Sequence, residues 1–180
     1  MIIVQLTGKP SAGKTTIANG AAERLANEGI PVEVLDGDVL RDSPINSGLG
    51  FSDEDRITNL NRIFYIAELL AKHNIVVIMA AINPFEAQRK KFASSGSHVK
   101  TVWIKCGWDV LLQRDTKGLY KRALLAEGSG NKLHHFTGID SRYEEPANPH
   151  LVIETDTLTI GESVDRLTLF ILQQLGHDAL

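Results

Sequence analysis

The chain has 180 residues, a formal net charge of −3 and a pI near 6.1, with 43% hydrophobic and 23% charged residues. These values fit one globular domain over residues 1–180 and argue against a general nucleic-acid binder, which needs a basic surface. The single cysteine excludes an internal disulfide. Because the sequence shows neither a signal peptide at its start nor an apolar run long enough to cross a membrane, we expect a cytoplasmic protein without a membrane partner.

Strand-like and helix-like segments alternate along the chain. Short apolar runs predict strands at 2–7, 32–36, 75–82, 99–106 and 150–155. Helical patterns lie between and after them, at 14–28, 53–72, 84–94, 108–125 and 161–175. This order predicts an α/β fold of three layers, α/β/α, with a central, mainly parallel five-stranded sheet. Residues 37–52 and 126–149 are rich in glycine and turn formers, and we expect them to be loops at the carboxyl edge of the sheet, where ligands bind.

The segment Gly8–Thr15 reads GKPSAGKT and matches the phosphate-binding pattern G-x-x-x-x-G-K-[ST] between a predicted strand and a predicted helix. Its backbone amides would hold the phosphates of ATP, Lys14 would add positive charge, and Thr15 would offer its hydroxyl to Mg²⁺. The residues expected to bind the nucleotide here are Gly8, Ser11, Ala12, Gly13, Lys14, Thr15 and Thr16. The chain lacks the N-K-x-D motif of GTPases, and the strand at 75–82 does not end in aspartate, so the pattern favours a small-molecule kinase.

Three further strings carry chemistry. In LDGDVLR (35–41), Asp36 and Asp38 flank a glycine at the end of a strand, where carboxylates can bind Mg²⁺ or accept a hydroxyl proton. Arg41 in the same string can bind an anionic group. The string GLGFSDEDRITN (48–59) gathers polar and aromatic residues around a helix start. The third region joins RDTKGLYKRA (114–123) to FTGID (136–140).

Together these strings resemble the adenylylsulfate kinase (APS kinase) family of P-loop kinases, whose patterns run approximately DGDNIR, LGFSxxDRxEN, ISPY/F, RDxKGLYxKA and FTGIDxxYExP. The matches run in order from Gly8 to about Asp156. The resemblance implies phosphoryl transfer from MgATP to the 3′-hydroxyl of adenosine 5′-phosphosulfate (APS) in sulfate activation and assimilation. It also implies a lid over about 114–145 and a homodimer.

The resemblance assigns roles to individual residues. Phe51 and Phe136 would stack on the base of the acceptor nucleotide, an arrangement that aromatic stacking favours. The residues expected around the rest of the acceptor are Arg41, Arg56, Asn59, Ile82, Asn83, Lys117 and His135. Arg114 and Lys132 would approach the ATP phosphates when the lid closes. Lys14, Asp36 and Asp38 form the catalytic set, in which Asp38 is the expected base and Asp36 is its rival or a Mg²⁺ ligand.

The chain departs from the family pattern mainly on the acceptor side. Asn83 replaces a serine that some members phosphorylate as an intermediate, and because asparagine cannot accept a phosphoryl group this way, we expect direct transfer. Val39 replaces an asparagine, and His135 stands where the family often has lysine or glycine. The sequence therefore leaves open another nucleotide-linked acceptor, such as cytidine diphosphoramidate. A non-catalytic nucleotide-binding module is a second alternative.

Overall fold

The computed structural model describes residues 1–96 and 98–176. Its strands are β1 (Ile3–Thr7), β2 (Val32–Asp36), β3 (Val76–Ala80), β4 (Val99–Lys105) and β5 (Leu151–Glu154). Its helices are α1 (Lys14–Asn27), α2 (Gly37–Arg41), α3 (Asp53–Lys72), α4 (Glu86–Ala93), α5 (Trp108–Gln113), α6 (Leu119–Ala123) and α7 (Ile160–Gln174), and a 3₁₀ turn spans Pro44–Asn46.

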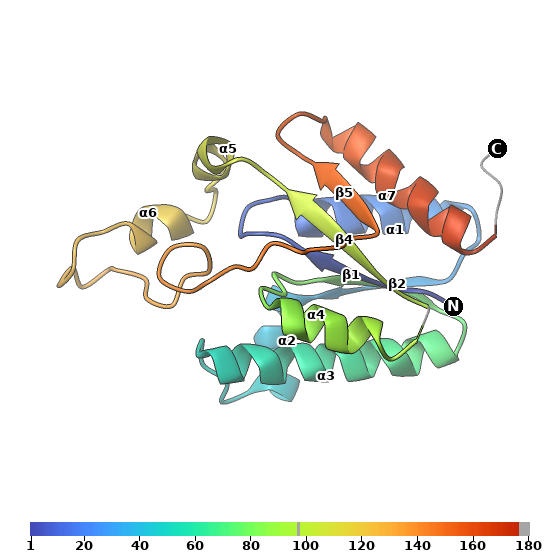
Figure 1. Ribbon diagram of the computed structural model, residues 1–180, viewed down its shortest axis with the longest axis horizontal. Helices are drawn as coiled ribbons and strands as arrows, with labels where there is room; N and C mark the ends of the chain where they lie inside the picture. The colour runs from blue at the N-terminus through green and yellow to red at the C-terminus, as the bar shows by residue number, and fades with distance from the viewer. Residues whose placement is uncertain (97, 177–180) are drawn as a thin grey trace.

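The strands form one parallel sheet in the order β2-β3-β1-β4-β5. The central strand β1 is buried along its whole length, and its Ile3 lies opposite Val77 of β3 and Val99 of β4. Helices α1 and α7 cover one face of the sheet, and α3 and α4 cover the other (Figure 1). The three-layer α/β/α arrangement with a parallel sheet is therefore confirmed.

An apolar cluster fills the space on each face of the sheet. The cluster under α1 and α7 includes Leu25, Val102 and Leu167, all completely buried. On the other face the rings of Phe64 from α3 and Phe92 from α4 stack with centroids 4.1 Å apart. Burying each side chain of this size stabilises the fold by roughly 1.5–3 kcal/mol, so the clusters fix both helical layers on the sheet.

Local capping decides where the helices next to the site begin. Ser52 and Asp55 form a capping box at the start of α3, and Thr159 and Glu162 form a second one at the start of α7. In each, the hydroxyl accepts a backbone N–H and the carboxylate returns to the first residue, which satisfies otherwise unpaired donors. These boxes, together with the parallel strands, fix the loops at the carboxyl edge of the sheet.

Two sequence predictions about secondary structure were wrong. The helix expected over 108–125 is broken, because α5 ends at Gln113 and the chain turns through Gly118, with φ of 63°, before α6 begins. The carboxylate of Asp115 accepts the backbone N–H groups of Leu119 and Lys121, which favours a new helix start over continuation. Residues 37–52 were expected to be irregular, yet α2 forms there.

The cause of α2 is a cap. Both backbone N–H groups at its start, those of Asp38 and Val39, donate to Oδ1 of Asp36, at 2.8 and 3.2 Å. This cap satisfies the first turn of a helix that spans only Gly37–Arg41.

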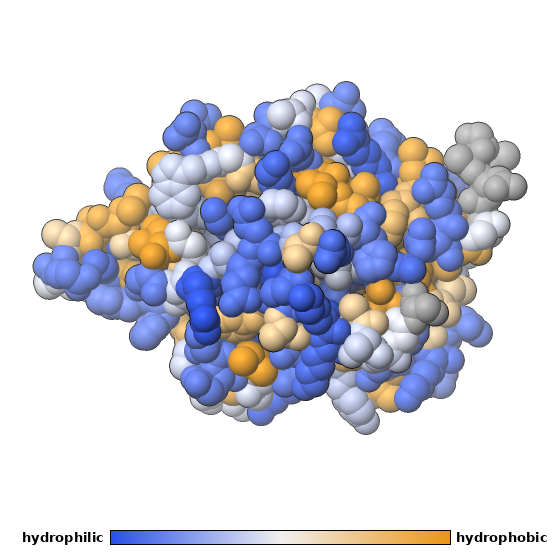
Figure 2. Space-filling model, viewed as in Figure 1, coloured by the Kyte–Doolittle hydropathy of each residue, from blue (hydrophilic) through white to orange (hydrophobic). Residues whose placement is uncertain are grey.

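Polar side chains cover much of the face seen in Figure 2, and apolar surface gathers over the projecting part around α6. Leu124, which follows α6, is among the exposed apolar residues there. Over residues 1–96 and 98–176, no helix combines the length and the apolar character that crossing a membrane requires.

Candidate active site

A cavity of about 950 Å³ opens at the carboxyl edge of the sheet. This volume lies at the upper end of the range for small-molecule sites. The predicted site residues on its walls are Ser11, Ala12, Gly13, Lys14, Thr15, Thr16, Asp36, Asp38, Arg41, Phe51, Arg56, Asn59, Ile82, Asn83, Arg114, Lys117, His135 and Phe136. Gly8 and Lys132 are the predicted site residues that do not line it.

The phosphate loop joins β1 to α1 and ends at Gly13, whose φ of 98° lies in the left-handed region that glycine tolerates. Lys14 is buried, and its Nζ donates to the carbonyl oxygens of Gly8 and Lys9, each at 2.9 Å. Burial lowers the pKa of Lys14 to about 8, although the nearby carboxylates of Asp38 and Asp36 raise it. A positive group held inside such a loop is suited to binding phosphate.

Gly8 serves the fold of the loop. A Cβ at this position would lie 2.4 Å from the carbonyl oxygen of Ile104 in β4. The residue is glycine because the backbone of the loop passes against the neighbouring strand. The prediction that Gly8 contacts the nucleotide has no support from the walls of the cavity.

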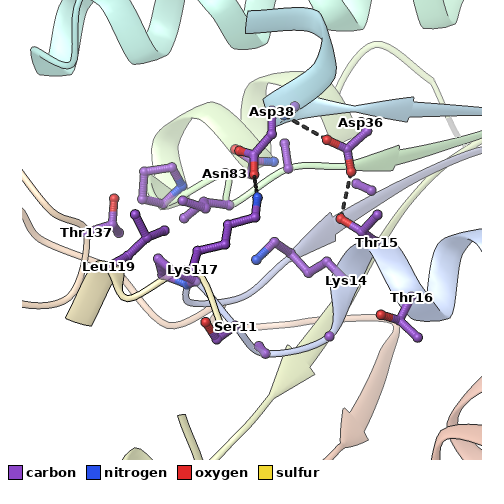
Figure 3. A pocket seen from close by; sticks show the side chains of 18 of the residues that line it. Ser11, Lys14, Thr15, Thr16, Asp36, Asp38, Asn83, Lys117, Leu119 and Thr137 are labelled. Atoms are coloured by element: carbon purple, nitrogen blue, oxygen red, sulfur yellow. Dashed lines mark hydrogen bonds and ion pairs between the residues drawn. The ribbon is translucent and has the colours of Figure 1, made fainter. Parts of the chain in front are cut away.

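Thr15 and Asp36 bring two oxygen ligands together. The Thr15 hydroxyl donates to Oδ2 of Asp36 at 2.6 Å (Figure 3). Mg²⁺ in kinases is held by one or two protein oxygens together with substrate phosphates. A hydroxyl and a carboxylate beside the phosphate loop fit that requirement. Because Oδ1 of Asp36 also caps α2, the carboxylate is fixed in orientation.

Asp38 lies two residues further along the chain, in the first turn of α2, with its side chain 73% exposed. Its Oδ2 accepts a hydrogen bond from Nζ of Lys117 at 2.8 Å, and Figure 3 shows Lys117 extending toward it from the segment before α6. This contact raises the pKa of Lys117, chiefly through the hydrogen bond that the ammonium donates to Asp38, so the lysine stays charged. A carboxylate and a cation therefore face the same part of the cavity.

Two aromatic rings lie on the acceptor side, one buried and one exposed to solvent. Phe136 is only 6% exposed, and its ring meets the ring of Tyr120 edge to face, with centroids 4.8 Å apart. Phe51 is 55% exposed, and the guanidinium of Arg41 lies 4.9 Å from its ring centroid. Arg41 also donates from Nη1 to the carbonyl of Gly50 at 2.6 Å. One ring is held by the protein and the other is open to a planar ligand.

Arg56 connects the segments that carry these two rings. Its Nε donates to the carbonyl of Phe51 at 3.1 Å, its Nη1 donates to Oγ1 of Thr137 at 2.6 Å, and its Nη2 donates to the carbonyl of His135. Burial lowers the pKa of Arg56, and the neighbouring charge of Arg41 lowers it further. A guanidinium has five N–H groups, so Arg56 can hold both segments and still donate to an anion.

A scan against protein-family models finds the adenylylsulphate kinase model over residues 1–154. The chain belongs to the adenylylsulphate kinase family. An adenylyl-sulfate kinase of Chloroflexus aurantiacus is 43% identical over 166 residues, which cover 92% of this chain and 86% of the relative. One of Gloeothece citriformis is 40% identical and covers 98% of this chain and 96% of its own length.

A solved structure supports the same assignment. The APS kinase of Mycobacterium tuberculosis, determined in complex with AMPPNP and APS, superimposes with a TM-score of 0.85 at 34% identity, over 96% of this chain and 97% of that one. The fold described above is therefore that of adenylylsulphate kinases, a family of phosphotransferases that act on an alcohol group.

Asn83 is the main departure from the adenylylsulphate kinase pattern, and it has a structural partner. Its side chain is 2% exposed, and its Nδ2 donates to Oε1 of Gln5 in β1 at 2.9 Å. Its φ of 45° is left-handed, a conformation that asparagine adopts more readily than most residues. Arg89 donates from Nη1 to its carbonyl at 2.7 Å. Although Asn83 lines the cavity, its amide nitrogen is committed to the core.

Asn59 lines the same cavity of the kinase. Within the described residues, Oδ1 of Asn59 and Oδ1 of Asn83 are the buried side-chain atoms without a hydrogen-bond partner. Buried polar atoms are almost always paired. Both residues line the cavity, but these two oxygens are shielded in this arrangement, so each would reach an acceptor molecule only after its side chain turns.

The residues predicted to reach the ATP phosphates differ in placement. Arg114 lines the cavity and donates from Nη2 to the carbonyl of Thr155 at 2.7 Å. Lys132 instead forms an ion pair with Glu127 within the long loop. In this arrangement Lys132 does not contribute to the site, and its approach on lid closure stays a prediction.

Sequence reasoning missed part of the cavity of this kinase. The additional wall residues include Leu119, Leu133, Thr137, Leu158, Thr159 and Ile160. Thr137 could have been found from its place in FTGID. Residues 158–160 carry no ligand signal in the sequence, because they reach the phosphate loop only through the position of β5 in the sheet.

Proposed function

We propose that this chain transfers the γ-phosphoryl group of ATP to the 3′-hydroxyl of adenosine 5′-phosphosulfate, giving 3′-phosphoadenosine 5′-phosphosulfate. One observation carries the proposal: the phosphate loop, the carboxylate of Asp38 and the rings of Phe51 and Phe136 all open onto one cavity of about 950 Å³. Donor and acceptor nucleotides thus have adjoining places in it. The complex of the M. tuberculosis relative with AMPPNP and APS supports this choice of ligands.

The donor end would hold ATP mainly through backbone groups and charge. Amides from Ser11 to Thr16 surround the start of α1, where the helix dipole favours phosphate. Lys14 would exchange its carbonyl partners for phosphate oxygens. Thr15 and Asp36 would hold Mg²⁺, which supplies charge neutralisation on the phosphates when bound.

The acceptor end would fix the base between the two rings. Phe136 provides a rigid face and Phe51 an exposed one. Arg41, Arg56 and Lys117 provide positive charge for the phosphosulfate. Asn59 lines this end of the cavity, and a turn of its side chain would let its unpaired oxygen accept a hydrogen bond from the same ligand.

Asp38 is our choice for the base that orients the 3′-hydroxyl and receives its proton. Asp36 is less suited, because its carboxylate already caps α2 and accepts the Thr15 hydroxyl. The carboxylate of Asp38 has one partner in the described structure, the exposed ammonium of Lys117. Acceptor binding would draw Lys117 toward the phosphosulfate and leave Asp38 free to take the proton.

Residues 114–145 would act as the lid over this site. They contribute Lys117, His135 and Phe136 to the cavity from a segment that projects beside the sheet (Figure 1). Closure over the nucleotides would exclude water, which otherwise competes as phosphoryl acceptor. We propose that the whole chain works as one kinase unit in this way.

The test is release of ADP from MgATP with APS, with cytidine diphosphoramidate, and without an acceptor. We expect turnover that depends on APS, and a Lys14→Met variant serves as the inactive control. Preference for the cytidine compound would replace the acceptor while keeping the chemistry. Nucleotide binding without turnover on either compound would contradict the proposal and favour a non-catalytic module.

We further propose that the protein is a cytoplasmic homodimer. Family resemblance supports the dimer. The formal net charge of −3 and the single cysteine fit a reducing compartment such as the cytoplasm. Size-exclusion chromatography with light scattering would give the mass of the assembly directly. A monomer at micromolar concentration would contradict the dimer.

A further inference from the structure

Tyr120 lies behind the active site and touches both of its halves. It is completely buried on α6, whereas the flanking residues Lys121 and Leu124 are exposed. Tyr120 is not on the wall of the cavity, so it does not contact the substrates directly. Its place suggests that it acts through the residues that do.

The hydroxyl end of Tyr120 meets the phosphate loop. It donates to the carbonyl oxygen of Pro10 at 3.1 Å. Burial raises the pKa of Tyr120, so the hydroxyl remains a donor over the physiological range. This bond is the contact through which α6 holds the loop between Gly8 and Gly13.

That contact sets the direction of a phosphate-binding amide. In a trans peptide the C=O and the following N–H point in opposite directions. Fixing the carbonyl of Pro10 toward Tyr120 therefore turns the N–H of Ser11 away from it. Ser11 has a φ of 61°, which costs a non-glycine residue free energy and needs support from its surroundings.

The ring of Tyr120 meets the acceptor half. It packs edge to face against Phe136, with centroids 4.8 Å apart and an interplanar angle of 84°, and it also meets Trp108 at 5.5 Å and 88°. Both are favourable aromatic geometries. With Tyr120 behind it, Phe136 has a fixed plane on which a base can stack.

We propose that Tyr120 is a positioning residue for both substrates: its hydroxyl orients the phosphate loop for ATP, and its ring holds Phe136 for the acceptor base. The acceptor part of this inference rests on the proposed function. The ATP part requires only that the loop binds a nucleotide.

Tyr120→Phe separates the two roles, because it deletes the hydroxyl and keeps the ring. The net contribution of one hydrogen bond predicts an ADP affinity about threefold to tenfold weaker, with a similar rise in KM for ATP. The KM for APS should stay within about twofold, since the ring is retained. Tyr65→Phe is the matched control, because Tyr65 is 62% exposed on α3 and should change none of these constants.

Calorimetric titration with ADP measures the first effect without any acceptor, and steady-state kinetics with APS measures the second. Unchanged ADP affinity in Tyr120→Phe would overturn the role of the hydroxyl, and an equal rise in both KM values would overturn the division of roles. Tyr120→Leu removes the ring as well and should also raise the KM for APS. If the wild type binds ADP but does not use APS, the proposed function fails while the ADP titration still decides the role of the hydroxyl.

Discussion

Lys117 donates a hydrogen bond to Asp38 at 2.8 Å and so joins the segment before α6 to α2. The pair brings together the base and one of the cations of the proposed reaction. Both side chains are largely exposed, at 65% and 73%, so the pair can open at little cost. The contact therefore keeps two reactive groups in place without locking them.

Asp38→Asn should fold normally and lose roughly 10² to 10⁴ in kcat, because general-base catalysis contributes about that factor. The amide keeps the shape of the side chain but cannot take a proton. Circular dichroism and steady-state turnover with MgATP and APS give the two readings. Asp109→Asn, an exposed site on α5, is the control. Turnover close to that of the wild type would make Asp36 the better candidate.

Lys117→Ala should raise the KM for APS by roughly tenfold to a hundredfold, the effect of losing a hydrogen bond to a charged group. The KM for ATP should change little, because Lys14 and the loop amides hold that nucleotide. Lys121→Ala removes an exposed lysine of the adjoining helix α6 and should leave both KM values unchanged. The assignment fails if the KM for ATP rises instead.

The buried ammonium of Lys14 makes stability depend on pH. Its folded pKa is about 8, against an ordinary value of 10.5. Between these values the unfolded chain holds a proton that the folded protein has released, so this group makes the free energy of unfolding increase with pH. Below about pH 8 both states hold the proton, and the contribution is constant.

Urea unfolding at about pH 7 and about pH 9.5 measures this effect, which should reach about 2 kcal/mol. Other groups titrate in the same window, so the quantity to compare is the difference between the wild type and Lys14→Met. Lys91→Met, on the exposed side of α4, should keep the slope of the wild type. Equal slopes in wild type and Lys14→Met would show that Lys14 has an ordinary pKa.

Asn83→Ser restores the residue that the family usually carries, and it should lower stability by about 1–2 kcal/mol. The serine cannot reach Gln5 in the same way, and it tolerates a positive φ less well. Turnover should stay within a few fold, because the amide nitrogen faces the core. Asn148→Ser, at an exposed position, is the control. A large fall in kcat with unchanged stability would assign Asn83 to the acceptor instead.

Sequence alone predicted the strands, the layers and many of the residues that line the cavity, because each depends on a local signal. The apolar runs are short and continuous, as strands buried on both faces require, and each motif directly follows or precedes one of them. The parallel sheet then brings the ends of β1, β2 and β3 to one edge. For this reason the sequence alone predicted that Lys14, Asp36 and Asn83 lie close together at this edge.

The remaining features depend on contacts between distant segments. The break at Arg114–Gly118 follows from the capping by Asp115, which competes with a helical pattern that looks continuous. The link from Arg56 to His135 and Thr137 joins residues about eighty positions apart. No local pattern encodes such a pair, and the same holds for the partnership of Asn83 with Gln5.

The two aromatic rings of the acceptor side differ in how firmly the protein holds them. Phe136 is buried and packs against Tyr120. Phe51 is largely exposed to solvent, and its segment is hydrogen-bonded to the side chains of Arg41 and Arg56. A larger or smaller base would be accommodated by shifting the Phe51 side, with no disturbance to the phosphate loop. We therefore expect relatives that use a different acceptor nucleotide to differ first in residues 37–52. The phosphate loop that binds ATP would keep its sequence.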